Sequence, residues 1–411
     1  MDNVYTTLKE RGFISQVTDA QAVEDLLGKE SVTFYIGYDP TADSLHAGSL
    51  LPLMAMAHMQ QAGHRPIGIL GGGTAMVGDP SGKTEMRKML TREHIDENAV
   101  GLAEQLGRFI DLAGGGAQML NNADWLLDLN YVAFLRDIGR HFSVNRMLSF
   151  ESYKIRLERG LSFLEFNYQL LQAYDFLVLY RQHGCKLQMG GDDQWGNIVA
   201  GMDLVRRVEA GAAYGLTFPL LTTAAGEKMG KTAAGAVWLS AERTSPYEFY
   251  QYFRNTDDRD VERFLAYFTF LSMDEVRALG AKQGEAINAS KEVLAYEATR
   301  IVHGQAAADS ARRAAKSAFA GATGGQADIP TTQLAADRLA AGVLIVDLLA
   351  EVGLTTSKSE ARRLIKQGGA RLGEEKVAGF DSQLTGADLV DGQVLLRAGK
   401  KRVHRIVKAD D

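Results

Sequence analysis

The sequence predicts an α/β protein built on a parallel sheet, followed by a mainly helical region and a small α+β unit. Two observations predict the sheet: a strand–helix–strand pattern lies between Val32 and Gly73, and a glycine-containing turn follows each strand. A third observation separates the C-terminal part, because the Gly/Pro-punctuated stretch 321–330 has the composition of a linker.

The first three elements follow from residue type. Val32–Gly37 is short, β-branched and aromatic, which is typical of a buried strand. Ser49–Gln61 is long and rich in Met, Leu and Ala and predicts a helix, and Pro66–Gly73 predicts a second strand. Ligands of parallel sheets bind beyond the carboxyl ends of the strands, so we expect a site in the loops that follow them.

The rest of the chain continues this alternation less regularly. Helical patterns dominate from Arg92 to about Gln182. Strand signals return at 186–191 and near 218–222, and the region 245–320 is mainly helical. Two helices and then two strands are expected in the C-terminal unit, at 343–352, 357–367, 393–397 and 403–407.

The composition is that of a globular protein with two or three domains. The 411 residues are 46% hydrophobic and 23% charged, which allows a large core. A lone cysteine, Cys185, excludes an internal disulfide framework and fits a reducing cytoplasm. The N-terminus lacks the apolar segment of a signal peptide and no apolar run is long enough to span a membrane, so we expect a cytoplasmic protein.

Charge is distributed unevenly along the chain. The net charge of −6 argues against a wholly basic nucleic-acid binder. The C-terminal part is nevertheless rich in cations: Lys358, Arg362, Arg363, Lys366, Arg371, Arg397, Lys400, Lys401, Arg402, Arg405 and Lys408. Composition alone leaves two interpretations open, a nucleic-acid-binding surface or the solvated face of a small domain.

The segment Asp39–Ser49 joins the first strand to the first helix. A nucleotide phosphate could bind there, because the first turn of a helix offers free N–H groups and the positive end of its dipole. Gly48 would allow close approach to the backbone, and Thr41 and His46 supply side-chain donors. The alternative is a plain helix cap with an ordinary histidine.

Two further loops carry cations. Gly226–Thr232 places two lysines three residues apart beside glycines, which suits a departing pyrophosphate because its charge grows as the bond to the α-phosphate breaks. Asp79–Lys83, with Arg87 one turn further on, adds two more cations. Each loop taken alone could equally be a solvated surface turn.

A polar stripe and a glycine-rich turn complete the candidate features. Tyr168, Gln172 and Asp175 lie at i, i+4 and i+7 and so share one helix face. Glu165 falls on the same stripe, so a solvent-facing surface is the alternative. Gly190–Asn197 follows a strand with two glycines and two carboxylates, which could bind a ribose or simply form a turn.

In their order and spacing these motifs resemble a known family. HAGS followed far along the chain by KMGKT resembles the paired HIGH and KMSKS signatures of class I aminoacyl-tRNA synthetases. The surrounding segments are similar to bacterial tyrosyl-tRNA synthetases over nearly the whole chain: YIGYDPTADSLHAGS, VGDPSGKTEMR, FNYQLLQAYDF, GGDDQWGNI and TSPYEFYQYFRNTDDRDV. The basic tail resembles an RNA-binding module shared with a small-subunit ribosomal protein.

The resemblance implies an architecture and an activity. It implies a Rossmann-like catalytic domain at 1–235 with a helical insertion at about 100–185, a helical anticodon-binding domain at 236–320, a linker at 321–340 and an RNA-binding domain at 341–411. The implied enzyme activates L-tyrosine with ATP and transfers it to tRNA(Tyr). Mg²⁺ would accompany the ATP phosphates without a dedicated protein metal site. Relatives are homodimers, so the helical insertion is an expected interface.

The resemblance also assigns residues to the two substrates. For tyrosine it implies contacts from Tyr35, Asp79, Tyr168, Gln172, Asp175 and Gln194, of which Tyr35 and Asp175 would bind the phenolic hydroxyl. For ATP it implies Gly37, Asp39, Gly48, Ser49, Gly191, Asp193, Met229 and Lys231. For the charge of the transition state it implies Thr41, His46, Lys83, Arg87, Lys228, Lys231 and Thr232. For tRNA it implies Arg206, Arg207, Arg362, Arg363, Lys366, Lys400, Lys401 and Arg402.

Three positions depart from the commonest family pattern, whereas Gly230, in place of the signature serine, is common among bacterial tyrosine enzymes. Ser49 replaces the second histidine of HIGH, Ile36 replaces a frequent cysteine, and Asp192 stands where serine is usual. These three put the ribose contacts in question. Gly230 is expected to make the loop more flexible.

Three alternatives remain at this point. A tryptophanyl-tRNA synthetase lacks the basic C-terminal module, and a nucleotidylyltransferase is usually shorter and lacks KMGKT. An RNA-binding protein descended from a synthetase would no longer catalyse, and intact His46, Lys228 and Lys231 argue against it.

Overall fold

The computed structural model describes residues 3–81, 90–114, 116–232, 235–320, 329–399 and 402–409. Lys83, Arg87, Lys400, Lys401 and the stretch 321–328 lie outside the described residues, as do the side chains of Lys231 and Thr232. The chain divides into two compact units. The first comprises 1–231, 236–240 and 257–290, and the second comprises 232–235, 241–256 and 291–411.

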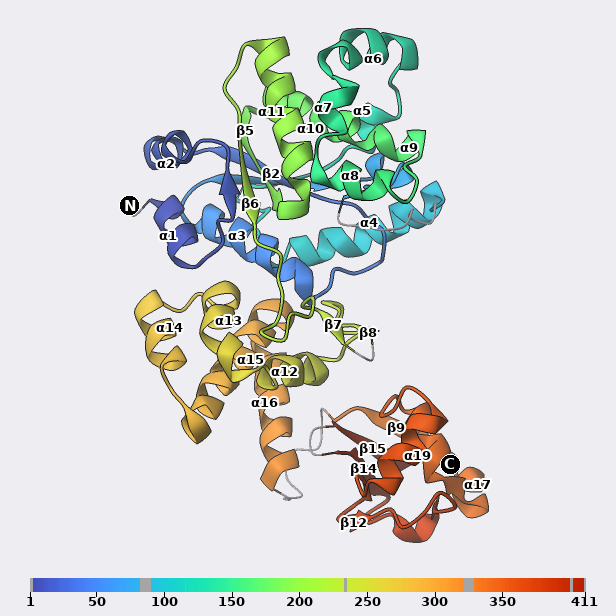
Figure 1. The fold of residues 1–411 in the computed structure, drawn as a ribbon. Helices are drawn as coiled ribbons and strands as arrows, with labels where there is room; N and C mark the ends of the chain where they lie inside the picture. The colour runs from blue at the N-terminus through green and yellow to red at the C-terminus, as the bar shows by residue number, and fades with distance from the viewer. Residues whose placement is uncertain are drawn as a thin grey trace. The chain divides into compact units, whose positions relative to one another are not determined.

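The first unit is built on a six-stranded sheet with the order β1-β6-β5-β2-β3-β4 (Figure 1). Five strands are parallel, and β1 pairs antiparallel with β6 at one edge. The strands are β1 Gln16–Val17, β2 Thr33–Tyr38, β3 Arg65–Leu70, β4 Gln118–Asn121, β5 Cys185–Gly191 and β6 Tyr214–Phe218. The predicted parallel α/β architecture is confirmed.

Strand β2 lies at the centre of this sheet, between β5 and β3, and most of its residues are buried. Four consecutive residues of β2 from Thr33 are buried, whereas Gly37 near its end is exposed. In the register of the sheet, Tyr35 lies opposite Ile67 of β3 and Gln188 of β5. Helix α3, at Leu50–Gln61, connects β2 to β3 and buries nine of its residues, as expected of a helix that is apolar all round.

Helices cover the sheet and extend from it. In the first unit they are α1 Val4–Glu10, α2 Ala20–Lys29, α3 Leu50–Gln61, α4 Arg92–Leu106, α5 Ala123–Leu126, α6 Tyr131–Asp137, α7 Val144–Met147, α8 Glu151–Leu157, α9 Phe163–Phe166, α10 Tyr168–His183, α11 Trp195–Glu209, α13 Val261–Phe268 and α14 Met273–Gly280. Short 3₁₀ turns lie at Ala47–Ser49, Thr74–Met76, Gly139–His141, Asp192–Gln194, Asp258–Asp260 and Gly284–Ala286.

Three details of the first unit differ from the sequence prediction. Strand β4 interrupts the stretch from 92 to 182, where mainly helices were expected. The strand has only four residues and none is fully buried, so its sequence shows no alternation of apolar and polar residues. The strand expected near 218–222 ends at Phe218, because Pro219 follows and cannot donate to a ladder. The edge strand β1 has only two residues and went unpredicted.

The second unit contains α12 Pro246–Arg254, α16 Gln305–Ala320 and most of α15 Ile287–His303, as predicted for a helical region. The β7 and β8 strands, Lys231–Thr232 and Gly235–Ala236, pair with each other at its boundary. Ser245 begins α12 with a capping box: its side chain accepts from the Glu248 N–H while Glu248 accepts from the Ser245 N–H.

The C-terminal part of the second unit has its own five-stranded sheet, in the order β12-β11-β14-β15-β9, and its own apolar core (Figure 1). Its elements are β9 Thr331–Leu334, α17 Ala336–Ala341, β10 Val343–Leu344, α18 Ile345–Glu351, α19 Lys358–Lys366, β11 Ala370–Leu372, β12 Glu375–Lys376, β13 Gln383–Leu384, β14 Gln393–Ala398 and β15 Arg402–Lys408. Two findings correct the prediction: β9 and α17 use residues expected in the linker, and Val343–Leu344 is a strand where a helix was expected. Both depend on distant partners, β15 and β13.

Among the described residues, no helix combines the length and the apolar character needed to cross a lipid bilayer.

Candidate active site

A cavity of about 400 Å³ opens at the carboxyl ends of β2 and β5, bounded by the loop after β2 and by helix α10. Segments far apart in the sequence meet there, at the place expected for ligands of a parallel sheet. Most residues selected from the sequence line it: Tyr35, Gly37, Asp39, Thr41, His46, Gly48, Ser49, Asp79, Tyr168, Gln172, Asp175, Gly191, Asp193 and Gln194.

The remaining candidates lie elsewhere. Lys228 is exposed and Met229 is buried, and neither lines the cavity as the described residues define it. Arg206 and Arg207 are exposed near the end of α11. The other described cations are exposed on α19 and β15 of the second unit: Arg362, Arg363, Lys366 and Arg402.

Asp175 forms the innermost polar group of the cavity. Its carboxylate accepts hydrogen bonds from Asn122 Nδ2 at 2.9 Å and from Trp125 Nε1 at 2.8 Å, and the residue is 3% exposed. Burial raises the pKa of Asp175 to about 7, while the two hydrogen bonds oppose this rise and the charge of Asp39 adds to it. Near neutral pH this carboxylate therefore changes between a donor and a pure acceptor.

Tyr35 lies beside Asp175 at the same end of the cavity. Its ring packs edge-on against Phe176, with ring centroids 5.4 Å apart, and it is 2% exposed. Its hydroxyl is buried and makes no hydrogen bond to any described residue. Burial first, and the charge of Asp175 second, raise the pKa of the Tyr35 hydroxyl well above its ordinary value, so the phenol stays protonated. A buried donor of this kind is costly unless a ligand accepts from it.

Asp39 is fixed by two hydroxyl groups. Tyr168 Oη donates to one carboxylate oxygen at 2.9 Å and Thr74 Oγ1 donates to the other at 2.8 Å. Asn122 Nδ2 in turn donates to Thr74 Oγ1 at 3.0 Å, which connects Asp39 to the Asp175 end of the cavity. Gly71 must be a glycine here, because a Cβ atom would lie 2.0 Å from Asp39 Oδ1.

Asp79 and two glutamines form a second network. Gln194 Nε2 donates to Asp79 at 2.7 Å, and Asn197 Nδ2 donates to the side-chain oxygens of Gln194 and Gln172, each at 3.1 Å. Burial raises the pKa of Asp79 to about 6, the Ser81 N–H opposes this, and the charge of Asp39 adds to the rise. With Asp193, four aspartates line this cavity, which favours binding of a cationic group.

The other end of the cavity is built from backbone. His46 Nδ1 accepts from the Gly48 N–H at 3.0 Å, which leaves Nε2 as the donor of the neutral ring. A Cβ atom on Gly48 would lie 2.8 Å from the His46 ring and 3.1 Å from the Met229 carbonyl oxygen. Gly230 has φ +81°, and a Cβ atom there would lie 2.7 Å from the Gly48 nitrogen. The two signature segments therefore touch through glycines.

Backbone hydrogen bonds extend this contact. The Ala47 N–H donates to the Val237 carbonyl and the Leu239 N–H to the Leu45 carbonyl, each at 2.8 Å. The His46 and Trp238 rings lie edge-on with centroids 6.3 Å apart, and Trp238 also lines the cavity. The segment after the lysine loop, Gly226–Thr232, thus pairs with the HAGS turn, His46–Ser49.

Helix α4 contacts the residues that directly precede the HAGS turn. Gln105 Oε1 accepts from the Leu45 N–H at 2.9 Å, and Gln105 Nε2 donates to Ser44 Oγ at 3.1 Å. Ser44 Oγ also accepts from the Ser240 N–H at 3.1 Å. One helix turn earlier, a Cβ atom on Gly101 would lie 2.3 Å from the Asp43 carbonyl oxygen. The loop that carries Thr41 and His46 is therefore held tightly in place.

The departures from the family pattern have separate outcomes. Ile36 and Ser49 both line the cavity, so they remain the positions where a ribose contact is in question. The Asp192 carboxylate does not line the cavity defined by the described residues, because it accepts from Ser15, Gln16 and Thr217 and secures the sheet edge. The close approach of Gly230 to Gly48 gives that glycine a steric role that the sequence did not reveal.

Sequence reasoning missed several residues of the site. Thr74, Asn122, Trp125 and Gln105 hold the catalytic candidates but carry no motif of their own, and Asn197 lies in the segment Gly190–Asn197 without having been assigned a role. Asn197 offered a weak signal, since it lies one helix turn after Gln194. The other four are brought to the site from distant elements. Among the described residues, no group of three His, Cys, Asp or Glu side chains could hold a metal ion.

Two family comparisons agree with this geometry. Residues 28–320 match the family described as tRNA synthetases class I (W and Y), and residues 322–406 match the tyrosine–tRNA ligase SYY-like C-terminal domain. The fold, the cavity and the first match define a class I aminoacyl-tRNA synthetase. The second match separates the chain from the tryptophan enzymes.

Similar proteins of full length give the same result. The tyrosine–tRNA ligase of Desulfatibacillum aliphaticivorans is 54% identical over 427 residues, covering 99% of each chain. That of Caldanaerobacter subterraneus is 56% identical over 406 residues, covering 98% of this chain and 99% of the relative. The chain belongs to the tyrosine–tRNA ligase family.

Solved structures show the same fold for the first part of the chain. A C-terminally truncated mitochondrial tyrosyl-tRNA synthetase of Aspergillus nidulans superposes with a TM-score of 0.70 at 31% identity, covering 77% of this chain and 94% of that one. The Archaeoglobus fulgidus tyrosyl-tRNA synthetase complexed with L-tyrosine, at 17% identity and a TM-score of 0.58, supports the fold alone.

Proposed function

We propose that this cavity forms tyrosyl-adenylate and pyrophosphate from L-tyrosine and ATP, after which the tyrosyl group passes to the 3′ end of tRNA(Tyr). The observation that supports this most directly is the pair Tyr35 and Asp175 at the innermost end. A phenolic hydroxyl placed between them would accept from Tyr35 and donate to Asp175, which satisfies both buried groups at once.

The rest of the tyrosine molecule would bind the polar networks. We assign its ammonium group to Asp79, Tyr168 and Gln172, with Asp39 on the same side. Gln194 would lie near the substrate carboxylate, and its bond to Asp79 fixes the orientation of its amide. The carboxylates of Asp79 and Asp39 suit an ammonium group and disfavour an anionic group at this position.

The nucleotide would occupy the backbone-built end of the cavity. We assign ATP contacts to Gly37, Asp39, Gly48, Ser49, Gly191, Asp193, Met229 and Lys231. Gly37 supports this, because no atom lies within 4 Å of the position where its Cβ would be. The side chain of Ser49 makes no cap hydrogen bond to α3 in the part of the chain described, which agrees with a role toward a ligand.

The chemistry needs positioning and charge stabilisation rather than a base. The tyrosine carboxylate is already ionised; its oxygen bonds to the α-phosphorus while the bond to pyrophosphate breaks. We assign these groups to the stabilisation of the growing negative charge: Thr41, His46, Lys83, Arg87, Lys228, Lys231 and Thr232. Mg²⁺ would enter with the ATP phosphates and neutralise part of that charge. A terminal ribose hydroxyl of the tRNA then attacks the adenylate carbonyl and releases AMP.

A pyrophosphate-exchange assay across the twenty amino acids tests the proposal. Tyrosine should support ATP–pyrophosphate exchange, and phenylalanine and tryptophan should not. Faster exchange with tryptophan, or none with tyrosine, would contradict it.

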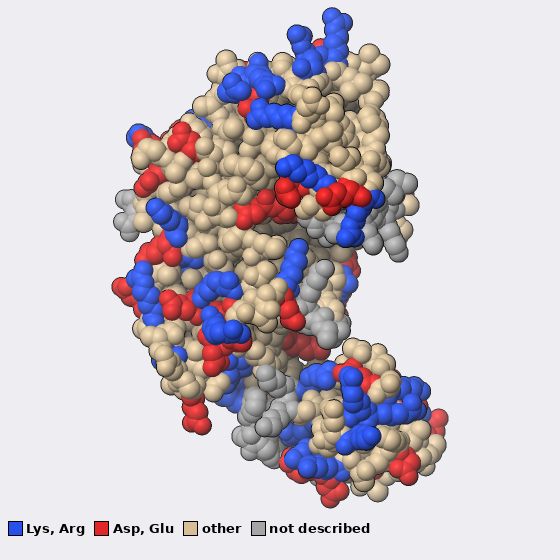
Figure 2. All heavy atoms as spheres, viewed as in Figure 1, with Lys and Arg blue, Asp and Glu red and all other residues tan. Residues whose placement is uncertain are grey.

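The tRNA contacts form a second part of the proposal. Lys and Arg side chains gather on the visible face of the C-terminal domain (Figure 2). The four described candidate cations of this domain are exposed: Arg362, Arg363, Lys366 and Arg402. We infer that these cations, Lys400 and Lys401 bind tRNA phosphates, and that Arg206 and Arg207 bind it from the catalytic domain. Replacing Arg362 and Arg363 with Ala should raise the KM for tRNA and spare amino-acid activation. Lys29→Ala, on the exposed side of α2, is the control.

A homodimer is the third part. Eight exposed large hydrophobic residues of the described chain lie within 131–164, including Phe163 at 71% and Leu157 at 56%. Such a concentration is typical of an interaction surface. Phe163→Asp should therefore yield monomers in sedimentation analysis. Val390→Asp, at a site 74% exposed in the C-terminal part of the chain, should leave the dimer intact. A monomeric native protein would contradict this inference.

The implied domain division remains part of the proposal. It comprises a catalytic domain at 1–235, an anticodon-binding helical domain at 236–320 and an RNA-binding domain after the linker. Two family matches that meet near residue 321 support the boundary before the C-terminal part alone. We infer a cytoplasmic enzyme, and the single buried thiol, Cys185, is compatible with a reducing compartment.

A further inference from the structure

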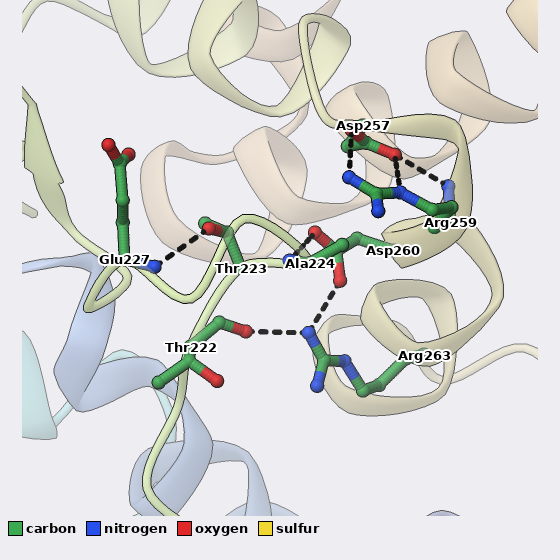
Figure 3. A network of polar contacts seen from close by, with 8 residues as sticks. All are labelled: Thr222, Thr223, Ala224, Glu227, Asp257, Arg259, Asp260 and Arg263. Carbon is green, nitrogen blue, oxygen red and sulfur yellow. Dashed lines mark hydrogen bonds and ion pairs between the residues drawn. The ribbon is translucent and has the colours of Figure 1, made fainter.

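A short hairpin that starts at Leu221 leads into the lysine loop, and its second arm forms the first part of that loop (Figure 3). The Thr223 N–H donates to the Glu227 carbonyl at 2.8 Å, and the Met229 N–H donates to the Leu221 carbonyl at 2.9 Å. A turn closed by the Gly226 N–H on the Thr223 carbonyl connects the two arms, with Gly226 at φ +82°. The second arm carries Lys228 and leads to Gly230, so whatever fixes the first arm also fixes these residues.

A buried carboxylate holds the first arm. Asp260 is 2% exposed and accepts from the Ala224 N–H at 2.7 Å (Figure 3). Its other oxygen accepts from Arg263, and the same Arg263 nitrogen donates to the Thr222 carbonyl. Asp260 and Arg263 thus bind the hairpin at two backbone positions, two residues apart, from the start of α13.

The chemistry of this contact indicates more than a helix cap. Asp260 precedes α13, yet its side chain makes no cap hydrogen bond to that helix among the described residues. A buried carboxylate needs hydrogen-bond partners, and charge-assisted bonds of this type are stronger than neutral ones. Both of its oxygens are directed to the loop or to the arginine that also holds the loop.

We propose that Asp260, together with Arg263, is a positioning residue that fixes the hairpin of the lysine loop, so that Lys228 reaches the departing pyrophosphate. This inference rests on the function proposed above. The path of the effect is continuous: α13 holds Thr222 and Ala224, the hairpin holds Lys228 and Met229, and Gly230 meets the HAGS turn at Gly48.

The chain supplies a matched control at the residue directly before Asp260. Arg259 forms a two-bond ion pair with Asp257, and its side chain is 67% exposed (Figure 3). Its hydrogen bonds among the described residues go to Asp257 and not to the hairpin. Arg259→Ala therefore removes a similar aspartate–arginine pair without removing a contact of the loop.

Two variants break the contact from opposite sides. Asp260→Ala removes the acceptor. Ala224→Pro removes the donor N–H and keeps Asp260, and proline is tolerated at the second position of a turn that follows an extended residue. Both are measured in the full-length chain by tyrosine-dependent ATP–pyrophosphate exchange, after thermal melting has confirmed folding.

The expected result is a split between the two substrates. Asp260→Ala and Ala224→Pro should lower kcat/KM for ATP by about 10- to 100-fold, the size expected when a catalytic group is misplaced by about an ångström. The KM for tyrosine should change less than about twofold in both variants. In Arg259→Ala, both kcat/KM for ATP and the KM for tyrosine should change less than about twofold. If Asp260→Ala does not fold, the ATP kinetics of Ala224→Pro alone test the positioning role of Asp260.

Two outcomes would overturn the inference. Unchanged ATP kinetics in the folded variants would show that the contact is merely structural, and so would equal losses for ATP and tyrosine. Absence of exchange in the unaltered chain would instead refute the proposed function, so the two failures can be distinguished.

Discussion

The two ends of the cavity are built in different ways. The tyrosine end is a set of buried side chains, in which Asp175 and Asp79 are 3% and 6% exposed and bind neighbours that are themselves fixed. The end that we assign to the nucleotide is made of backbone and glycines, with Gly48 and Gly230 in close approach, and the exposed Lys228 lies two residues before Gly230 in the adjoining loop.

The difference follows from what each end has to do. Selecting one side chain requires polar groups that are costly when left unpaired, and such groups must be desolvated and rigid. Holding charge that develops only during the reaction requires donors that come close at that moment, and an exposed lysine avoids the penalty of burial. Selectivity is thus placed in the core and charge stabilisation in a loop.

The largest expected effect breaks the tyrosine end. Asp175→Ala removes the acceptor for the phenolic hydroxyl, and the preference for tyrosine over phenylalanine should fall by about 10- to 150-fold, the value of a hydrogen bond to a charged group. The ratio of kcat/KM values in the exchange assay measures it. An unchanged ratio would exclude Asp175 from the pocket for the phenol.

The next effect breaks the nucleotide end alone. Lys228→Ala should lower kcat for activation by about tenfold, a modest value because the lysine is exposed and screened. The KM for tyrosine should not change. Glu227→Ala, which alters an adjacent exposed side chain, is the control. Equal effects of the two substitutions would contradict a specific role for the lysine.

A pH profile sharpens the comparison. The ionised Asp175 accepts from the substrate phenol, so kcat/KM for tyrosine should fall about tenfold per unit below its pKa of about 7. In Asp175→Asn this fall should disappear and leave a fall nearer pH 6 from Asp79. A profile that is flat from pH 6 to 8 in the unaltered chain would contradict this assignment.

Stability should depend on pH with the opposite sign. Folding raises the pKa of Asp175 above its ordinary value, so its contribution is fully present below the unfolded pKa and is lost as the pH rises through about 7. Without ligand, melting temperatures should therefore decline between pH 5 and 8, and less so in Asp175→Asn.

The smallest expected effect separates flexibility from close approach. Gly226 and Gly230 have nearly the same φ, +82° and +81°, but only Gly230 faces an atom, Gly48 N, where a Cβ would lie. Gly230→Ala should therefore lower kcat for activation about fivefold more than Gly226→Ala, which corresponds to about 1 kcal/mol of overpacking. Equal effects would show that backbone strain alone matters.

Sequence reasoning succeeded for elements whose burial or function can be predicted from the local pattern of residues. The continuous apolar run of β2 and the helix α3 were predicted from local pattern alone. Spacing placed Tyr168, Gln172 and Asp175 on one helix face, but it left a solvent-facing surface open until the family resemblance assigned them to the site. The two signature segments fixed the family because their residue types are chemically required. The reasoning failed for β4, β9 and β10, since each is a short strand whose identity comes from a partner distant in sequence.

The sequence by itself determined the parallel-sheet architecture, the family and most residues that line the cavity, because periodicity and motif spacing are local properties of the chain. Only the tertiary structure decided how those residues are held. Asn122 and Trp125 bind Asp175, Gln105 binds the HAGS loop and Asp260 binds the lysine loop, each across many residues of chain. No local pattern encodes such pairs, because a hydrogen bond between distant segments depends on how the whole core packs.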